Sequence, residues 1–101
     1  MIYRKIFVSG KVQGVFFRES TRQVASELSL SGGVRNLTDG RVEVQVSGDD
    51  ASVQSLIKWL KIGPKLAKVS TIEVLELEAL EQGSVFQSRD RNGCFEIWAT
   101  K

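Results

Sequence analysis

The chain has 101 residues, of which 42% are hydrophobic and 26% charged, so its composition is that of a folded globular protein and its length that of one domain. Its net charge of +2 is far below the clustered positive charge of nucleic-acid-binding proteins, so a nucleic acid is not an expected partner. It contains no histidine, which excludes Ser-His and Cys-His nucleophile pairs and the most common zinc ligand.

The first third of the chain changes from a strand pattern to a helix pattern. Residues 3–12 alternate between polar and apolar side chains and predict a strand. A helix is predicted over residues 18–30, with Gly32 and Gly33 as its stop signal. The apolar face of this helix follows helical spacing and consists of Phe17, Thr21, Val24, Ala25 and Leu28.

A hairpin is predicted next, with strands over residues 33–37 and 41–48. The pair Asp39-Gly40 between them favours a type I′ turn, in which both central residues have positive φ. The second strand alternates, which predicts one apolar buried face and one polar face. The apolar face consists of Val42, Val44 and Val46, and the polar face of Glu43, Gln45 and Ser47.

The second half of the chain begins with a clear helix pattern. Asp49 or Asp50 is the expected N-cap, and the pair Gly63-Pro64 is the expected stop. The apolar positions between them are Val53, Leu56, Ile57 and Leu60. A strand over residues 69–76, a long surface loop over residues 81–93 and a final strand over residues 94–99 complete the prediction.

This order of elements predicts an α+β fold. Strand, helix, strand, strand, helix and strand, followed by a terminal strand, suit a ferredoxin-like two-layer sandwich with two helices on one face of an antiparallel sheet. We expect residues 1–101 to form a single domain, because no linker, repeat or low-complexity segment interrupts them.

The connection between the first strand and the first helix has the features of an anion site. The first N–H groups of a helix lack internal partners and carry a partial positive charge. Gly14 allows the backbone to approach a ligand, and Arg18 offers two forked donors to phosphate oxygens. The alternative is an ordinary turn followed by a solvated arginine. Residues 1–41 carry +4 and the remainder −2, which favours a small anionic ligand near this connection.

Asn36 is a second candidate, on the strand that leads into the Asp-Gly turn. An asparagine near a turn commonly bonds to backbone groups. If its amide instead points toward the anion site, it can hold a water molecule. The residues themselves leave both interpretations open.

Two segments together resemble the acylphosphatase family. They are GKVQGVFFR, residues 10–18, and GVRNLTDGRVEV, residues 33–44, and the resemblance covers nearly the whole chain. It implies a ferredoxin-like fold and hydrolysis of the carboxyl-phosphate bond of acyl phosphates. By position, Arg18 matches the phosphate-binding arginine of the family and Asn36 the asparagine that orients the attacking water. The family's phosphate loop matches the backbone amides of Gln13, Gly14, Val15, Phe16, Phe17 and Arg18.

Two positions depart from the family pattern. Gly33 stands where members often carry an aromatic residue, and Trp98 stands where many carry arginine. Both departures bear on local packing and on how the C-terminal strand supports the site.

The expected partners follow from the same resemblance. They are a small-molecule acyl phosphate and, as site ligand, phosphate or sulfate, with no cofactor and no metal, because no Asp, Glu or Cys cluster has ligand spacing. Because Cys94 is the only cysteine and no signal sequence or apolar run of about 18 residues is present, we expect a cytoplasmic monomer that does not contact membranes.

Two other functions compete with the enzyme. An RNA-binding sheet needs aromatic side chains on its central strands, and residues 41–46 have none. A regulatory domain that has lost catalysis would keep the fold. The presence of both Arg18 and Asn36 favours the enzyme.

Overall fold

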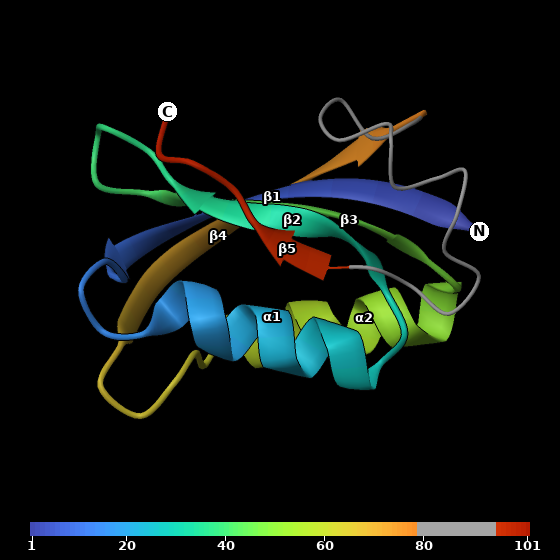
Figure 1. The fold of residues 1–101 in the computed structure, drawn as a ribbon, viewed down its shortest axis with the longest axis horizontal. Coiled ribbons are helices and arrows are strands. Elements are labelled where there is room, and N and C mark those ends of the chain that lie inside the picture. Colours follow the sequence, from blue (N-terminus) through green and yellow to red (C-terminus); the bar gives the residue numbers. More distant parts are fainter. Residues whose placement is uncertain (79–94) are drawn as a thin grey trace.

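The computed structural model describes residues 1–78 and 95–101, and it contains a helix or strand at each predicted place. The predicted loop over residues 81–93 and Cys94 lie outside the described residues. The elements are shown in Figure 1 and are β1 (Ile2–Lys11), α1 (Phe17–Glu27), β2 (Ser31–Asn36), β3 (Val42–Gly48), α2 (Asp50–Leu60), β4 (Lys68–Leu77) and β5 (Phe95–Ile97).

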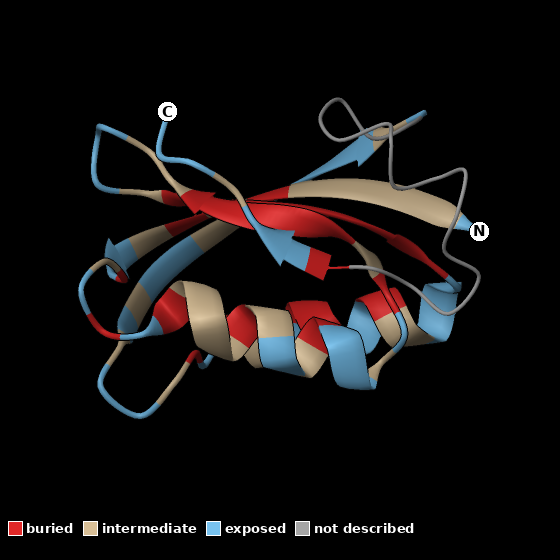
Figure 2. Ribbon diagram, in the orientation of Figure 1, coloured by how far each residue is buried: buried red, intermediate tan, exposed pale blue. Residues whose placement is uncertain are grey.

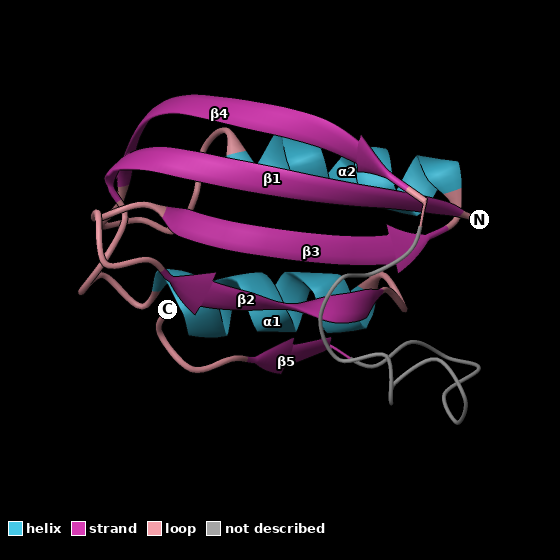
Figure 3. Ribbon diagram, turned by 90° about the horizontal axis from the view of Figure 1, so that it is seen from above, coloured by secondary structure: helices cyan, strands magenta, loops and turns pink. Residues whose placement is uncertain are grey.

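The five strands form one sheet in the order β4-β1-β3-β2-β5, which Figure 3 shows from above. The first four are antiparallel neighbours, as the ferredoxin-like prediction requires. β5 instead pairs parallel with β2, with Gly32 opposite Phe95 and Val34 opposite Ile97. The predicted antiparallel sheet is therefore mixed at this edge, because alternation predicts a strand but not the direction in which it pairs. No helix in the described part of the chain is long and apolar enough to span a membrane.

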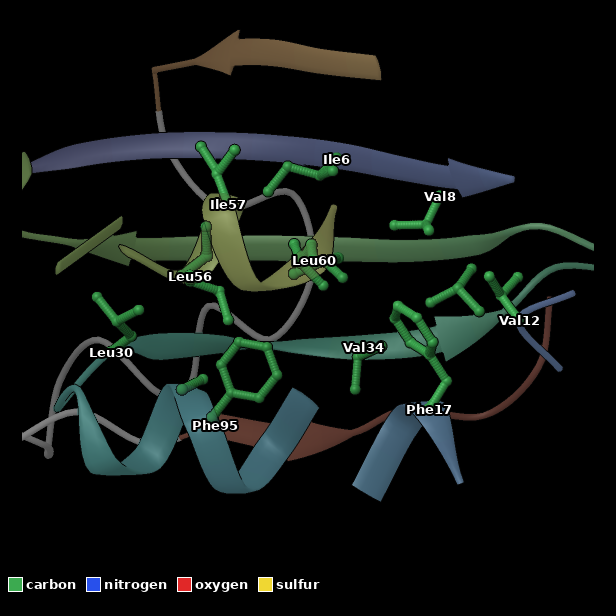
Figure 4. Close-up of a cluster of buried hydrophobic side chains, with 14 of the residues drawn as sticks. Ile6, Val8, Val12, Phe17, Leu30, Val34, Leu56, Ile57, Leu60 and Phe95 are labelled. Carbon is green, nitrogen blue, oxygen red and sulfur yellow. The ribbon is translucent and has the colours of Figure 1, made fainter. Parts of the chain in front are cut away.

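Both helices pack on one face of the sheet, and the core lies between the two layers (Figures 1 and 2). The predicted apolar face of β3 is fully buried there, together with Ile6 and Val8 of β1 and Leu56 and Leu60 of α2 (Figure 4). The ring of Phe17, at the start of α1, is 2% exposed. Its centroid lies 5.8 Å from that of Trp59 in α2, so the first residue of α1 is fixed against both the sheet and the second helix.

Helix α1 ends earlier than predicted, at Glu27 instead of Leu30. Ser29 takes a left-handed conformation with φ +58°, and the Leu30 N–H donates to the Ala25 carbonyl at 2.9 Å. This is a Schellman-type end, and it turns the fully buried Leu30 into the core. The predicted stop, Gly32 and Gly33, belongs to β2.

The hairpin between β2 and β3 is confirmed, but its turn is not type I′. Only Gly40 of the turn has positive φ, at +96°, so Asp39 does not adopt the conformation that a type I′ turn needs. The Gly40 N–H donates to the Leu37 carbonyl at 3.1 Å, and the Leu37 N–H donates to the Arg41 carbonyl at 2.8 Å. These bonds define a three-residue loop in which glycine alone takes the left-handed position.

The polar side of β3 is also buried, although no helix covers that face of the sheet in Figure 1. Glu43 accepts hydrogen bonds from Arg35 of β2 at 3.2 and 3.3 Å and from the Gln45 side chain at 2.7 Å. The Arg35 and Glu43 side chains are only 8% and 5% exposed, so removing either one would leave the charge of the other buried without its ion-pair partner.

Trp98 covers this polar network. Its ring lies against the backbone of Gly33, where an added Cβ would be 2.1 Å from Trp98 Cε2. The Arg35 guanidinium carbon lies 5.8 Å from the centre of the same ring. The two departures from the family pattern are therefore one arrangement, in which an aromatic ring from the C-terminal segment occupies the space above Gly33.

Candidate active site

A cavity of about 340 Å³ opens at the start of α1. The connecting loop and the first helical turn contribute Gly14, Phe16, Phe17, Arg18 and Glu19 to its walls. Asn36 of β2 and Ile97 of β5 close it from the sheet. We call it the Arg18 cavity.

The connecting loop leaves backbone donors without partners next to this cavity. Gly14 has φ +74°, and Phe16, the N-cap of α1, has φ +61° and makes no side-chain capping bond. No described residue accepts a hydrogen bond from the N–H groups of residues 14–18. Unpaired N–H groups beside the partial positive charge of a helix N-terminus are suited to an anion.

Arg18 is the cation of the cavity, in the first turn of α1 as predicted. Among residues 1–78 and 95–101, no carboxylate pairs with it. The neighbouring Glu19 is instead held by Arg22, with N···O distances of 2.9 and 2.6 Å. The Arg22 hydrogen bonds keep the pKa of Glu19 below its usual value. Glu19 is therefore ionised at neutral pH, and it leaves Arg18 available to a ligand.

Asn36 supplies the acceptor of the cavity. Its Oδ1 is buried and accepts no hydrogen bond from any described residue. The side chain lies on the same face of β2 as the buried Val34, the face that the helices cover, because alternate residues of a strand share a face. Its own carbonyl accepts from the Lys101 N–H at 3.1 Å, which fixes the backbone at this point. A buried amide oxygen without a partner costs free energy unless a ligand or water donates to it.

Gln13 joins the connecting loop to the hairpin that carries Asn36. Its side-chain Nε2 donates to the carbonyls of Leu37 and Arg41, at 2.8 and 2.9 Å. The loop and the end of β2 therefore hold a fixed relative position, although 24 residues separate Gln13 from Leu37 in the chain. Sequence reasoning assigned Gln13 only a backbone role and missed this contact.

The structure brings most of the predicted site residues together. Gly14, Phe16, Phe17, Arg18 and Asn36 all line the Arg18 cavity. Gln13 and Val15 do not, since the Gln13 side chain turns to the hairpin and Val15 is 5% exposed in the core. Ile97 was missed, because its place depends on the parallel pairing of β5, which no local pattern in the sequence encodes.

The described residues contain no group of three Cys, Asp or Glu side chains arranged to hold a metal ion.

Comparisons with known proteins agree on one family. The family model described as Acylphosphatase matches residues 4–88. A curated acylphosphatase of Rubrobacter xylanophilus is 47% identical over 85 residues, covering 84% of this chain and 77% of the relative. The crystal structure of acylphosphatase from Bacillus subtilis superposes with a TM-score of 0.82 at 35% identity, over 97% of this chain and 99% of the other. An acylphosphatase from Coxiella burnetii gives 0.80 at 40% identity, over 96% and 92%.

Proposed function

The chain belongs to the acylphosphatase family, and we propose that the Arg18 cavity is where it hydrolyses the carboxyl-phosphate bond of acyl phosphates, releasing a carboxylate and inorganic phosphate. One observation carries the assignment of the site. Arg18, free of any described carboxylate, and Asn36, with a buried unpartnered oxygen, line the same cavity at a helix N-terminus.

The phosphoryl group binds to the connecting loop. The free N–H groups of residues 14–18 donate to its oxygens, and the Arg18 guanidinium donates two further hydrogen bonds. These donors are in place before substrate binds, so they stabilise the charge that develops on the phosphoryl oxygens without reorganisation. A phosphate or sulfate ion occupies the same position.

Water is the nucleophile, and Asn36 orients it. The buried Oδ1 of Asn36 accepts a hydrogen bond from the water, which attacks phosphorus in line with the departing oxygen. The leaving group is a carboxylate whose conjugate acid has a pKa of about 4, so it departs at neutral pH without a proton donor. Positioning and electrostatic stabilisation then suffice, which fits a chain without histidine.

We further propose that the protein is a cytoplasmic monomer and that its reaction requires no metal. The single cysteine supports a reducing compartment. Light scattering after size exclusion tests the oligomeric state. Hydrolysis of benzoyl phosphate at equal rates with and without EDTA tests the metal.

Two variants test the site. Arg18→Ala and Asn36→Ala should each lower kcat/KM for benzoyl phosphate by roughly 100- to 1000-fold. Competitive inhibition by millimolar phosphate should weaken in Arg18→Ala and persist in Asn36→Ala, because only Arg18 binds the phosphoryl group directly. Far-UV circular dichroism checks that both variants are folded.

Arg4→Ala is the matched control, because it removes the same charge from the other end of β1, where the Arg4 side chain donates, among the described residues, to the Tyr3 carbonyl at 2.9 Å. Near-normal hydrolysis by a folded Asn36→Ala would remove Asn36 from the mechanism. Equal losses in Arg4→Ala and Arg18→Ala would reduce the role of Arg18 to a general effect of charge.

A further inference from the structure

Phe16 is the one residue of the connecting loop whose side chain neither the fold nor the phosphoryl group accounts for. It is 77% exposed, although it is a large apolar residue. Its left-handed backbone conformation, φ +61° and ψ +26°, is one that glycine or asparagine would adopt more easily. Residues held in such conformations cluster at functional sites, so we expect the exposed ring to have a function.

The Phe16 ring borders a second cavity as well as the Arg18 cavity. This second cavity, of about 450 Å³, lies between the start of α1 and the segment that follows α2, and we call it the Leu66 cavity. Its other walls come from Val15 and Ser20 on one side and Pro64, Lys65 and Leu66 on the other. Leu66 is 61% exposed, so two large apolar side chains face water across one hollow next to the phosphate-binding loop.

The in-line geometry of the reaction decides on which side of the phosphorus the acyl group lies. The attacking water is held at Asn36, so the leaving carboxylate lies on the opposite side of the phosphorus. Ile97 is on the Asn36 side, because β5 pairs with β2, the strand that carries Asn36. Phe16 belongs to the connecting loop, and the opposite wall of the Leu66 cavity belongs to the segment after α2, which in Figure 1 reaches below the start of α1, on the far side from the sheet.

We propose that Phe16 and Leu66 form the subsite for the acyl group of the substrate. This inference rests on the proposed function. The phosphoryl group binds in the Arg18 cavity, and the acyl group crosses the exposed face of Phe16 into the Leu66 cavity. Covering two exposed apolar side chains is favourable, and an aromatic acyl group gains further from stacking on the Phe16 ring. The substrates that fit best are therefore acyl phosphates with an aromatic or extended apolar acyl group.

The test compares two substrates that share the phosphoryl group and differ in the acyl group. Benzoyl phosphate reaches the subsite and acetyl phosphate does not. The measured quantity is the ratio of their kcat/KM values, in which general damage to the loop cancels. We expect wild type to favour benzoyl phosphate, and Phe16→Ala to lower the ratio by about 2- to 10-fold, the range of a single aromatic contact. Leu66→Ala should lower it by a smaller factor.

Ile97→Ala is the matched control. Ile97 lines the Arg18 cavity and, like Leu66, is an aliphatic residue that is partly exposed, at 42%. Its ratio should equal that of wild type. A ratio lowered by Ile97→Ala and unchanged by Phe16→Ala and Leu66→Ala would place the acyl group on the other side and overturn the inference. An unchanged ratio in all three variants would also overturn it, while leaving the proposed function intact. If wild type hydrolyses neither substrate, the function and the subsite both fail.

Discussion

Replacing Gly33 by alanine tests the packing of Trp98 on the sheet. Gly33 does not have positive φ, so alanine brings no backbone strain. Its Cβ would however lie 2.1 Å from Trp98 Cε2 and 2.5 Å from Cδ2 and Cζ2, where real Cβ contacts are never shorter than 3.0 Å. Since three atoms of one rigid ring overlap with the new carbon, the whole indole must move.

The loss of stability follows from the contacts that the indole of Trp98 gives up when it moves. Moving Trp98 exposes part of its apolar surface and removes the contact at 5.8 Å with the Arg35 guanidinium. Partial loss of an aromatic side chain's burial and of one cation–π contact together come to about 2 kcal/mol in the free energy of unfolding. Trp98→Ala should cost a similar amount, because it removes the same contacts.

The losses in the free energy of unfolding caused by Gly33→Ala and by Trp98→Ala should not be additive. Once Trp98 is alanine, nothing in the ring's place meets the new Cβ, and Gly33→Ala should cost nothing or stabilise slightly, because glycine weakens a strand. Urea unfolding of wild type, both single variants and the double variant, followed by far-UV circular dichroism, gives a coupling energy that we expect to be about 2 kcal/mol. If Gly33→Ala costs the same with and without Trp98, the ring does not rest on Gly33.

Two further predictions concern the loop and the second helix. Gln13→Leu keeps the size of the side chain but removes both hydrogen bonds to the Leu37 and Arg41 carbonyls, so we expect a higher KM for benzoyl phosphate and weaker phosphate inhibition; unchanged values of both would mean that the loop holds its position without Gln13. Asp49, the N-cap of α2, accepts from the Ser52 N–H at 3.1 Å, and this backbone hydrogen bond lowers the pKa of its carboxyl below 3.8. A carboxyl whose pKa is lowered by folding stabilises the fold at pH values above its ordinary pKa. This contribution to the free energy of unfolding is lost as the pH falls through the lowered pKa. Asp49→Asn keeps the cap without the titration. The Tm difference between wild type and Asp49→Asn should therefore shrink between about pH 5 and pH 2, and a constant difference would contradict the assignment.

The elements of this fold are predictable because their patterns are local. The alternation of β3 and the helical spacing of α2 each lie within one short segment, and Asp49 is found as the N-cap where two candidates were open. The predicted end of α1 was wrong because it relied on a local pattern. Gly32 and Gly33 form a strong local stop signal, but the helix ends earlier, at Glu27, where the chain turns to bury Leu30. Packing in the core determined the boundary, and a single segment does not contain that information.

The residues of the site likewise fall into two groups: those that the sequence indicates and those that depend on contacts between distant segments. A glycine and an arginine at a strand-to-helix change indicate an anion site locally, and family resemblance adds Asn36. That Asn36 faces the helices follows from its position two residues after the buried Val34, which is visible only when the covered face of β2 is known. Ile97 and the Gln13 side chain could not be predicted, because both contacts join segments that are distant in the chain.

The hydrogen bonds of Lys101 have a practical consequence for how this molecule is handled. Its N–H donates to the Asn36 carbonyl at 3.1 Å, and its carbonyl accepts from the Thr38 N–H at 2.9 Å. A purification tag, fluorophore or surface attachment joined after Lys101 would start beside the residue proposed to hold water. Met1 lies toward the other end of the sheet in Figure 1, and it is 86% exposed. Attachments for immobilised assays therefore belong before Met1, away from the residue proposed to hold water.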